Sequence, residues 1–205
     1  MVRVKICGIT NIEDAQASAE AGCDALGFVF YKESRRFVSP ARAAKIIAQI
    51  PGNILRVGVF VDAKEKDIRW AKDLCRLDLL QFHGEEKPEF CDKFKDCKVI
   101  KAFRIRKMRD VRAVSRYDTY AYLFDTYIKG KPGGTGEKFD WELVKDFDRG
   151  KHEIFLSGGL NPKNVRQAIE IVKPDWVDAS SSLEAIPAKK DHKKVAEFIK
   201  AAKVL

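Results

Sequence analysis

The sequence has none of the features that mark membrane, secreted or fibrous proteins. No apolar run approaches the roughly 18 residues that a membrane-spanning helix requires. The opening residues, MVRVKICGIT, contain neither a long apolar segment nor a small-residue cleavage site, so we expect no signal peptide and a cytoplasmic protein. The 13 glycines and 7 prolines follow no period, which excludes collagen-like and low-complexity classes.

The number and spacing of the cysteines argue against metal and disulfide frameworks. The five cysteines include no CxxC pair, whereas a zinc ribbon needs two such pairs and a disulfide framework favours an even number of cysteines. We therefore expect free thiols in a reducing compartment and no metal site. Cys23, Cys75, Cys91 and Cys97 are interpreted as small buried apolar residues.

Acidic residues are outnumbered by basic ones. The 30 Asp and Glu against 39 Lys and Arg give a net charge of +9. The two densest basic stretches, 104–112 and 189–194, lack the interleaved aromatic side chains of a nucleic-acid stacking surface. Both also carry acids, so we interpret them as solvated helix faces and expect no nucleic-acid or membrane partner. A non-catalytic module for anionic polymers is an alternative, and the charge can also concentrate an anionic substrate.

What the sequence does contain is a set of eight short runs of apolar, β-branched and aromatic residues, which begin 20 to 32 residues apart. Each run has the length of a strand and ends in small or polar residues. The runs cover residues 2–8, 24–30, 55–61, 79–84, 99–104, 121–126, 153–159 and 176–181.

Helix signals lie between these runs. Thr10 and Glu13 have the spacing of a capping box. Serine or asparagine precedes proline at Ser39–Pro40 and Asn161–Pro162, a pattern that starts helices, and residues 189–203 carry an apolar stripe at helical spacing.

The alternation of strands and helices predicts a single-domain (β/α)8 barrel over residues 1–205. An open doubly wound sheet is the structural alternative. The longest loops, 31–39 and 127–139, follow the second and sixth strands. In a barrel both loops lie on the face where active sites are built.

Several polar side chains occur in the strand runs at positions that alternation directs into the barrel. Burying such groups alone is costly, so they form either a satisfied internal network or the rim of a site. Lys5 and Asp178 come from adjacent strands, which allows an internal ion pair. Cys7 and Asp125 lie near strand ends, where catalytic groups of this fold lie. The complete set is Arg3, Lys5, Cys7, Gln81, His83, Asp125 and Asp178.

Two small-residue loops predict a phosphate site. Gly158 and Gly159 follow the seventh strand, and Ser180 and Ser181 follow the eighth. Backbone N–H groups at such turns bind anions, and a phosphate site after strands seven and eight recurs in this fold. The alternative is that the two glycines only permit a tight turn.

Specific motifs occur in a fixed order along the chain. They are KICGIT (5–10), GFVF (27–30), SRR (34–36), QFHG (81–84), LFDT (123–126), GGTG (133–136), SGGLNP (157–162) and VDASS (177–181). With these motifs the chain resembles, over essentially its whole length, the phosphoribosylanthranilate isomerase family of tryptophan biosynthesis.

The resemblance implies an Amadori rearrangement of N-(5-phosphoribosyl)anthranilate, a small phosphoribosyl substrate, with no cofactor and no metal. It implies that Cys7 is the general base and Asp125 the general acid, and that Arg36 holds the anthranilate carboxylate. The expected substrate-binding residues are Arg36, Gln81, His83 and Asp178, and the expected phosphate-binding residues are Gly158, Gly159, Ser180 and Ser181. The acting unit is expected to be a monomer or a homodimer.

A related enzyme family is an alternative to this resemblance, and one residue differs from the usual pattern of the resembled family. The related isomerase of histidine biosynthesis uses aspartates at both acid and base positions, so Cys7 argues against it. Ser182 stands where the resembled family usually has glycine. If that position needs a positive φ, serine strains the backbone, and we expect Ser182→Gly to raise both stability and phosphate affinity. If instead the hydroxyl donates to the phosphate, the same change weakens binding.

Overall fold

Eight parallel strands close into a barrel in which each strand pairs with its neighbours in chain order and β8 pairs with β1. The computed structural model describes residues 1–126 and 141–203. The strands are β1 (Arg3–Cys7), β2 (Ala25–Val29), β3 (Leu55–Phe60), β4 (Leu79–Phe82), β5 (Lys98–Ile105), β6 (Ala121–Thr126), β7 (Glu153–Leu156) and β8 (Trp176–Ala179). The barrel prediction is confirmed, and the open sheet is wrong.

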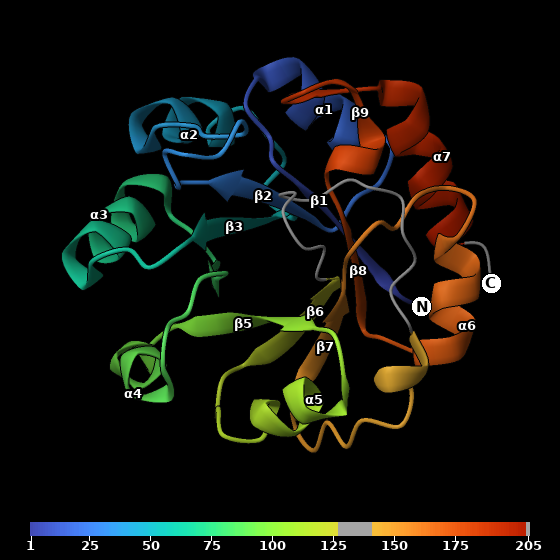
Figure 1. Cartoon of the computed structure of the whole chain (residues 1–205). Coiled ribbons are helices and arrows are strands. Elements are labelled where there is room, and N and C mark those ends of the chain that lie inside the picture. The colour runs from blue at the N-terminus through green and yellow to red at the C-terminus, as the bar shows by residue number, and fades with distance from the viewer. Residues whose placement is uncertain (127–140, 204–205) are drawn as a thin grey trace.

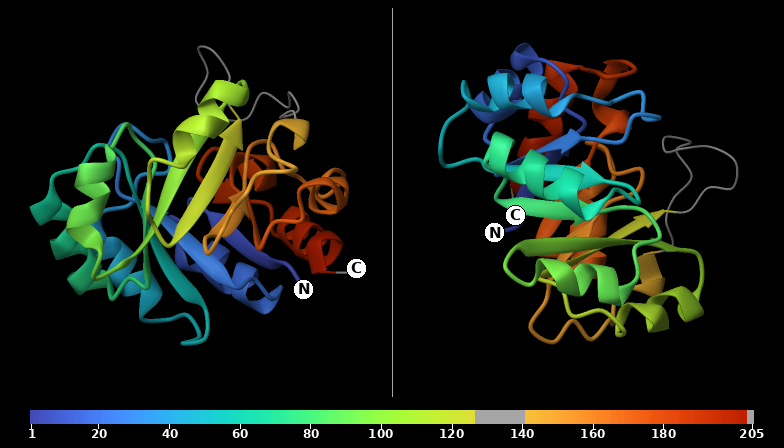
Figure 2. Two further views of the ribbon diagram at one scale, coloured as in Figure 1. Left: turned by 90° about the horizontal axis from the view of Figure 1, so that it is seen from below. Right: turned by 90° about the vertical axis from the view of Figure 1, so that its left-hand side faces the viewer.

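Helices surround the strands, and α7 lies beside the start of β1 (Figures 1 and 2). They are α1 (Ile12–Glu20), α2 (Pro40–Ile47), α3 (Glu65–Cys75), α4 (Pro88–Cys91), α5 (Met108–Val114), α6 (Val165–Val172) and α7 (His192–Lys203). Short 3-10 turns occur at η1 (Asp92–Phe94), η2 (Trp141–Leu143) and η3 (Ser181–Leu183), and a small hairpin, β9 (Glu184–Ile186) and β10 (Lys189–Lys190), precedes α7. In the described part of the β6–β7 connection, η2 is the sole helical element.

The predicted helix starts differ from the observed ones at two places. Asn11, rather than Thr10, caps α1, because its side chain accepts a hydrogen bond from the N–H of Asp14. The α6 helix begins at Val165 instead of Pro162, since residues 162–164 form a turn after Asn161. The Ser39–Pro40 start of α2 is confirmed.

Side-chain alternation divides the core into two layers. Val4 and Ile6 of β1 belong to the layer between strands and helices, whereas Lys5 on the same strand is fully buried. A second apolar cluster, to which Phe155 and Trp176 belong, draws its residues from seven of the barrel strands. These two rings stack with their centroids 4.9 Å apart. The lower barrel is therefore filled by apolar groups, and the polar side chains gather toward the carboxyl ends of the strands.

Candidate active site

Cys7 ends β1 and is buried, with 7% of its surface exposed. Its neighbour on the same face, Lys5, pairs with Asp178 of β8 at 2.8 Å, so the predicted internal ion pair is confirmed. Burial raises the pKa of the Cys7 thiol, and the positive charges of Lys5 and Lys190 act in the opposite direction. The thiol thus lies between a low-polarity interior, which disfavours a thiolate, and ammonium groups that favour one.

Asp125 lies near the end of β6 and contacts His83, another residue of the predicted set. The imidazole of His83 lies 3.2 Å from the Asp125 carboxylate, measured from Nε2 to Oδ2. On its other side, Nδ1 of His83 lies 2.8 Å from the amide nitrogen of Gln81. Because an amide nitrogen can only donate, Nδ1 accepts, and the proton of a neutral imidazole is on Nε2, directed at Asp125. The structure therefore joins Gln81, His83 and Asp125 in one chain of hydrogen bonds.

Arg36 crosses the barrel mouth directly beside the β1 terminus. A Cβ atom at Gly8 would lie 2.5 Å from Cδ of Arg36, and Gly8 has a φ of +80°. Glycine is therefore needed both for the turn after Cys7 and for the close approach of the arginine stem. Nε and Nη2 of Arg36 donate to the two carboxylate oxygens of Glu184 at 2.6 and 2.9 Å. Among the described residues Arg36 has no other side-chain partner, which leaves Nη1 available to a ligand.

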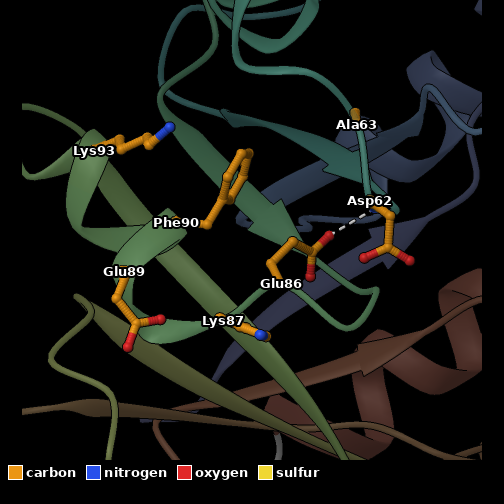
Figure 3. Close-up of a pocket in the computed structure, with 7 residues that line it drawn as sticks. All are labelled: Asp62, Ala63, Glu86, Lys87, Glu89, Phe90 and Lys93. Atoms are coloured by element: carbon orange, nitrogen blue, oxygen red, sulfur yellow. Dashed lines mark hydrogen bonds between the residues drawn. The ribbon is translucent and has the colours of Figure 1, made fainter.

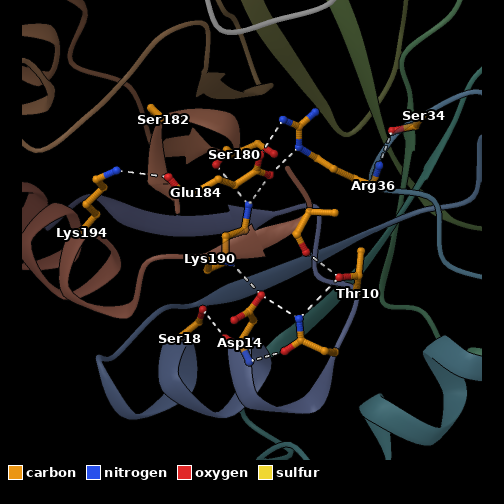
Figure 4. A network of polar contacts seen from close by, with 12 residues as sticks. Thr10, Asp14, Ser18, Ser34, Arg36, Ser180, Ser182, Glu184, Lys190 and Lys194 are labelled. Atoms are coloured by element: carbon orange, nitrogen blue, oxygen red, sulfur yellow. Dashed lines mark hydrogen bonds and ion pairs between the residues drawn. The ribbon is translucent and has the colours of Figure 1, made fainter. Parts of the chain in front are cut away.

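Glu184 is the centre of a polar network that sequence reasoning did not place in the site (Figure 4). Arg36 reaches it from the loop after β2, and Nζ of Lys190 reaches it from β10 at 3.4 Å. Lys190 also donates to the Ser180 carbonyl at 3.1 Å, and its backbone N–H donates to Asp14. Burial lowers the pKa of Lys190, against the influence of Glu184.

The interpretation of residues 189–194 as a solvated helix face is wrong for Lys190. Its side chain is fully buried, and residues 189–190 form a strand rather than the start of a helix. The sequence could not predict the burial of Lys190, because a run of lysines is usually exposed. The hairpin turns one of them inward. The cysteine interpretation, by contrast, is confirmed for Cys23, Cys75 and Cys91, which are buried, while Cys97 is only partly buried.

The two loops of the predicted phosphate site come from neighbouring strands. Gly158 and Gly159 have φ values of +85° and +68°, a conformation that glycine adopts without strain. Ser180 precedes η3, and Ser181 begins it. Because β7 and β8 lie between β6 and β1 in the barrel, the two loops lie between the strands that carry Asp125 and Cys7.

Ser182 contradicts the expectation of backbone strain. It lies within η3 and is absent from the residues of positive φ, so glycine is not required there. Its hydroxyl donates to the carbonyl of Leu160. The side chain therefore ties the loop after β8 to the loop after β7, a role that neither prediction for Ser182 anticipated.

A cavity of about 430 Å³ opens beside the ends of β3 and β4 (Figure 3). Glu86 at its edge accepts from the N–H of Asp62 at 2.9 Å. None of the predicted site residues lines it; the lining residues are Asp62, Ala63, Glu86, Lys87, Glu89, Phe90 and Lys93. The predicted loop 127–139, with its GGTG motif, lies outside the described residues.

Residues 1–126 and 141–203 contain no cluster of three or more side chains able to hold a metal ion. In the same ranges, every helix is too short or too polar to cross a membrane.

Comparisons with known proteins agree with this geometry. The sequence model of the family described as N-(5'phosphoribosyl)anthranilate (PRA) isomerase matches residues 4–201. The chain is 47% identical to the N-(5'-phosphoribosyl)anthranilate isomerase of Geobacter sp. (strain M21), with all of both chains covered. It matches the crystal structure of phosphoribosyl anthranilate isomerase from Thermotoga maritima with a TM-score of 0.94 and 46% identity over all of both chains. A further crystal structure of such an isomerase, in complex with reduced 1-(o-carboxyphenylamino)-1-deoxyribulose 5-phosphate, matches with a TM-score of 0.90 and 45% identity, again over all of both chains.

Proposed function

The chain belongs to the N-(5'-phosphoribosyl)anthranilate isomerase family, and from this premise we propose how its residues perform the isomerisation of tryptophan biosynthesis. The substrate is N-(5-phosphoribosyl)anthranilate and the product is 1-(2-carboxyphenylamino)-1-deoxyribulose 5-phosphate. The observation that carries the proposal is the placement of Cys7 and Asp125 at the same end of the barrel on β1 and β6, with the β7 and β8 loops between them. A phosphate held by those loops anchors a substrate between the two groups.

Asp125 acts as the general acid of the first step. Opening of the furanose ring requires a proton on the ring oxygen as the C1′–O bond breaks, and the anilino nitrogen supplies electrons to form the iminium ion. A carboxyl group at the barrel mouth can deliver that proton. The hydrogen bond between His83 and Asp125 fixes the direction of the carboxyl group, and Gln81 fixes the imidazole in turn.

Cys7 acts as the general base of the second step. Its thiolate takes the proton from C2′, and the C–H electrons form the C1′=C2′ bond of an enaminol while the iminium nitrogen becomes neutral. Protonation of C1′, with loss of the hydroxyl proton from O2′ as the C2′=O bond forms, then gives the aminoketose. Burial of Cys7 keeps the thiolate poorly solvated, which strengthens it as a base.

The two ends of the substrate are held by different parts of the mouth. The free Nη1 of Arg36 faces the anthranilate carboxylate, while Nε and Nη2 stay on Glu184. Backbone N–H groups of Gly158, Gly159, Ser180 and Ser181 hold the phosphate. Asp178 contributes through Lys5 and the Ser157 hydroxyl, which lies 3.4 Å from its carboxylate. No cofactor or metal takes part, and the enzyme acts in the cytoplasm as a monomer or a homodimer.

A fluorescence assay tests the proposal. Anthranilate substrate fluorescence should disappear when the protein is added, because the product lacks the same emission. Persistence of the signal with pure, folded protein would contradict the isomerase assignment. The aminoimidazole substrate of the histidine-pathway isomerase and an anionic polymer serve as comparison ligands, and conversion of the former would redirect the assignment to that rival.

A further inference from the structure

Besides Lys190 of the hairpin, two lysines on the barrel strands are buried and differ in character: Lys5 on β1 and Lys101 on β5. The ammonium group of Lys101 is saturated by its surroundings. It donates to the carboxylate of Glu86 at 3.0 Å and to three backbone carbonyls, those of Phe82, Gly84 and Ala102, at 3.3, 2.8 and 3.1 Å. Lys101 is thus a structural cation that closes the region between β4 and β5.

Lys5 is held on one side only. Its Nζ donates to Oδ1 of Asp178 at 2.8 Å, and the Cys7 thiol lies near enough for the charge of Lys5 to act on it. An ammonium group has three N–H donors. Lys101 directs its donors at a carboxylate and three carbonyl groups, whereas Lys5 directs one at Asp178. Lys5 therefore differs from Lys101 in having few hydrogen-bond partners, whereas a purely structural lysine would be expected to be fully bonded.

Gly27 leaves the space in which the two side chains meet. It is the register partner of Cys7 on the neighbouring strand β2. A Cβ atom at Gly27 would lie 2.8 Å from Sγ of Cys7 and 3.2 Å from Nζ of Lys5. Any larger residue would therefore push against both the sulfur and the ammonium group.

We infer that Lys5 is a positioning residue for Cys7: its ammonium ion, oriented by Asp178, stabilises the thiolate that removes the C2′ proton. This inference rests on the proposed function, which makes Cys7 the base. Before proton transfer the site holds the cations of Lys5 and the substrate iminium and the anions of Asp178 and Cys7. Afterwards the thiol and the enaminol are neutral, and the Lys5–Asp178 pair remains.

Charges around the thiol are consistent with this role. Burial raises the pKa of Cys7 and the carboxylate of Asp178 raises it further, while Lys5, through its charge and its hydrogen bond, and Lys190 lower it. Burial alone would lower the pKa of Lys5, but Asp178 and Cys7 outweigh it and keep the ammonium form. Arg36 and Glu184 lie beyond Gly8 and pair with each other. Lys5 is therefore the cation that acts most strongly on the thiol, and its Nζ and the sulfur border the same space beside Gly27.

The test is the titration of Cys7 in Lys5→Met, followed by thiolate absorbance in the ultraviolet. The same measurement on each background carrying Cys7→Ser isolates Cys7 from the other four cysteines. We expect the Cys7 pKa to rise by at least about one unit, with a tenfold or larger loss of kcat near neutral pH, a smaller change in KM, and a matching shift of the pH–kcat profile.

Lys101→Met is the matched control, because it also removes a buried lysine that pairs with a carboxylate. It should lower stability without moving the Cys7 titration. Lys5→Met/Asp178→Leu replaces the ion pair by apolar groups, a change that often preserves folding, and the Cys7 pKa should lie between those of the wild type and Lys5→Met. If Lys5→Met does not fold, the Cys7 pKa is measured in this double variant instead.

An unchanged Cys7 titration in the Lys5 variants would overturn the inference. So would an equal shift in Lys101→Met, since the effect would then follow any buried lysine. Failure of the proposed function is recognised separately: if Cys7→Ser alone keeps wild-type turnover, Cys7 is not the base, whatever Lys5 does to its titration.

Discussion

Arg36 and Glu184 form a two-point ion pair, with Nε to Oε1 at 2.6 Å and Nη2 to Oε2 at 2.9 Å, although 148 residues separate them in the chain. Parallel hydrogen bonds of this kind fix the plane of the guanidinium group as well as its position. Glu184 thereby determines the direction of the remaining amino group, Nη1, across the barrel mouth.

Arg36→Lys should raise KM by about tenfold or more, because a point charge can neither keep both bonds to Glu184 nor direct a third donor at the substrate carboxylate. Steady-state kinetics measure the effect. Arg35→Lys, at the exposed neighbouring arginine, is the matched control and should leave KM unchanged. An analogue without the carboxylate should show a much smaller loss in Arg36→Lys, and equal losses for both substrates would assign Arg36 a structural role.

Asp125→Asn should lower kcat by about a hundredfold or more, because the amide cannot protonate the ring oxygen. Substrate affinity, measured by fluorescence titration, should change by only a few-fold. Asp62→Asn removes another carboxylate at the rim, one that accepts from the N–H of Glu85, and should keep kcat. Wild-type turnover in Asp125→Asn would move the acid role to another group, with Asp178 and His83 the next candidates.

Ser182→Ala should lower the free energy of unfolding by about 1 kcal/mol, because it leaves the Leu160 carbonyl without its hydroxyl partner. Phosphate affinity, measured by calorimetry with inorganic phosphate, should fall only slightly. Ser115→Ala is the control, since that hydroxyl also donates to a backbone carbonyl but on an exposed helix end. A higher melting temperature in Ser182→Gly than in wild type would revive the strain explanation.

Glu153→Gln should reduce stability and weaken its dependence on acid pH. Burial acts to raise the pKa of Glu153, but hydrogen bonds from Arg3, Trp176 and Tyr120 outweigh it and hold the pKa below its usual value. A depressed carboxylate pKa contributes stability that is present above the unfolded-state pKa and is lost as pH falls through the folded-state value. Melting curves between pH 3 and 7, a range of about four units around the ordinary carboxylate pKa, should converge for the two proteins at the acid end; parallel curves would contradict this.

The sequence predicts the strands well because their physical signal is local. Short apolar runs with regular spacing identified all eight strands, and alternation placed Lys5 and Asp178 inside the barrel, where they pair. Helix starts were less certain, since Thr10 and Asn11 can both cap a helix and only the chain path decides. Thr10 instead donates to the Ala188 carbonyl, far along the chain.

Contacts made by the segment after β8 could not be predicted from spacing. Lys190 becomes buried because the hairpin of β9 and β10 folds over α1, where Asp14 accepts its N–H. The role of Glu184 likewise depends on a contact with a distant residue, because Arg36 donates to both of its carboxylate oxygens. These positions depend on tertiary contacts between distant segments, for which a single sequence carries no periodic signal.

The central claim is that Cys7 supplies the base for proton removal at C2′. The most direct measurement is a single-turnover experiment with excess enzyme, in which the decay of anthranilate substrate fluorescence is compared between the wild type and Cys7→Ser. We expect Cys7→Ser to bind the substrate with nearly wild-type affinity and the fluorescence then to decay at least about a hundredfold more slowly. Decay within a few-fold of the wild-type rate would contradict the account and make Cys7 a core cysteine.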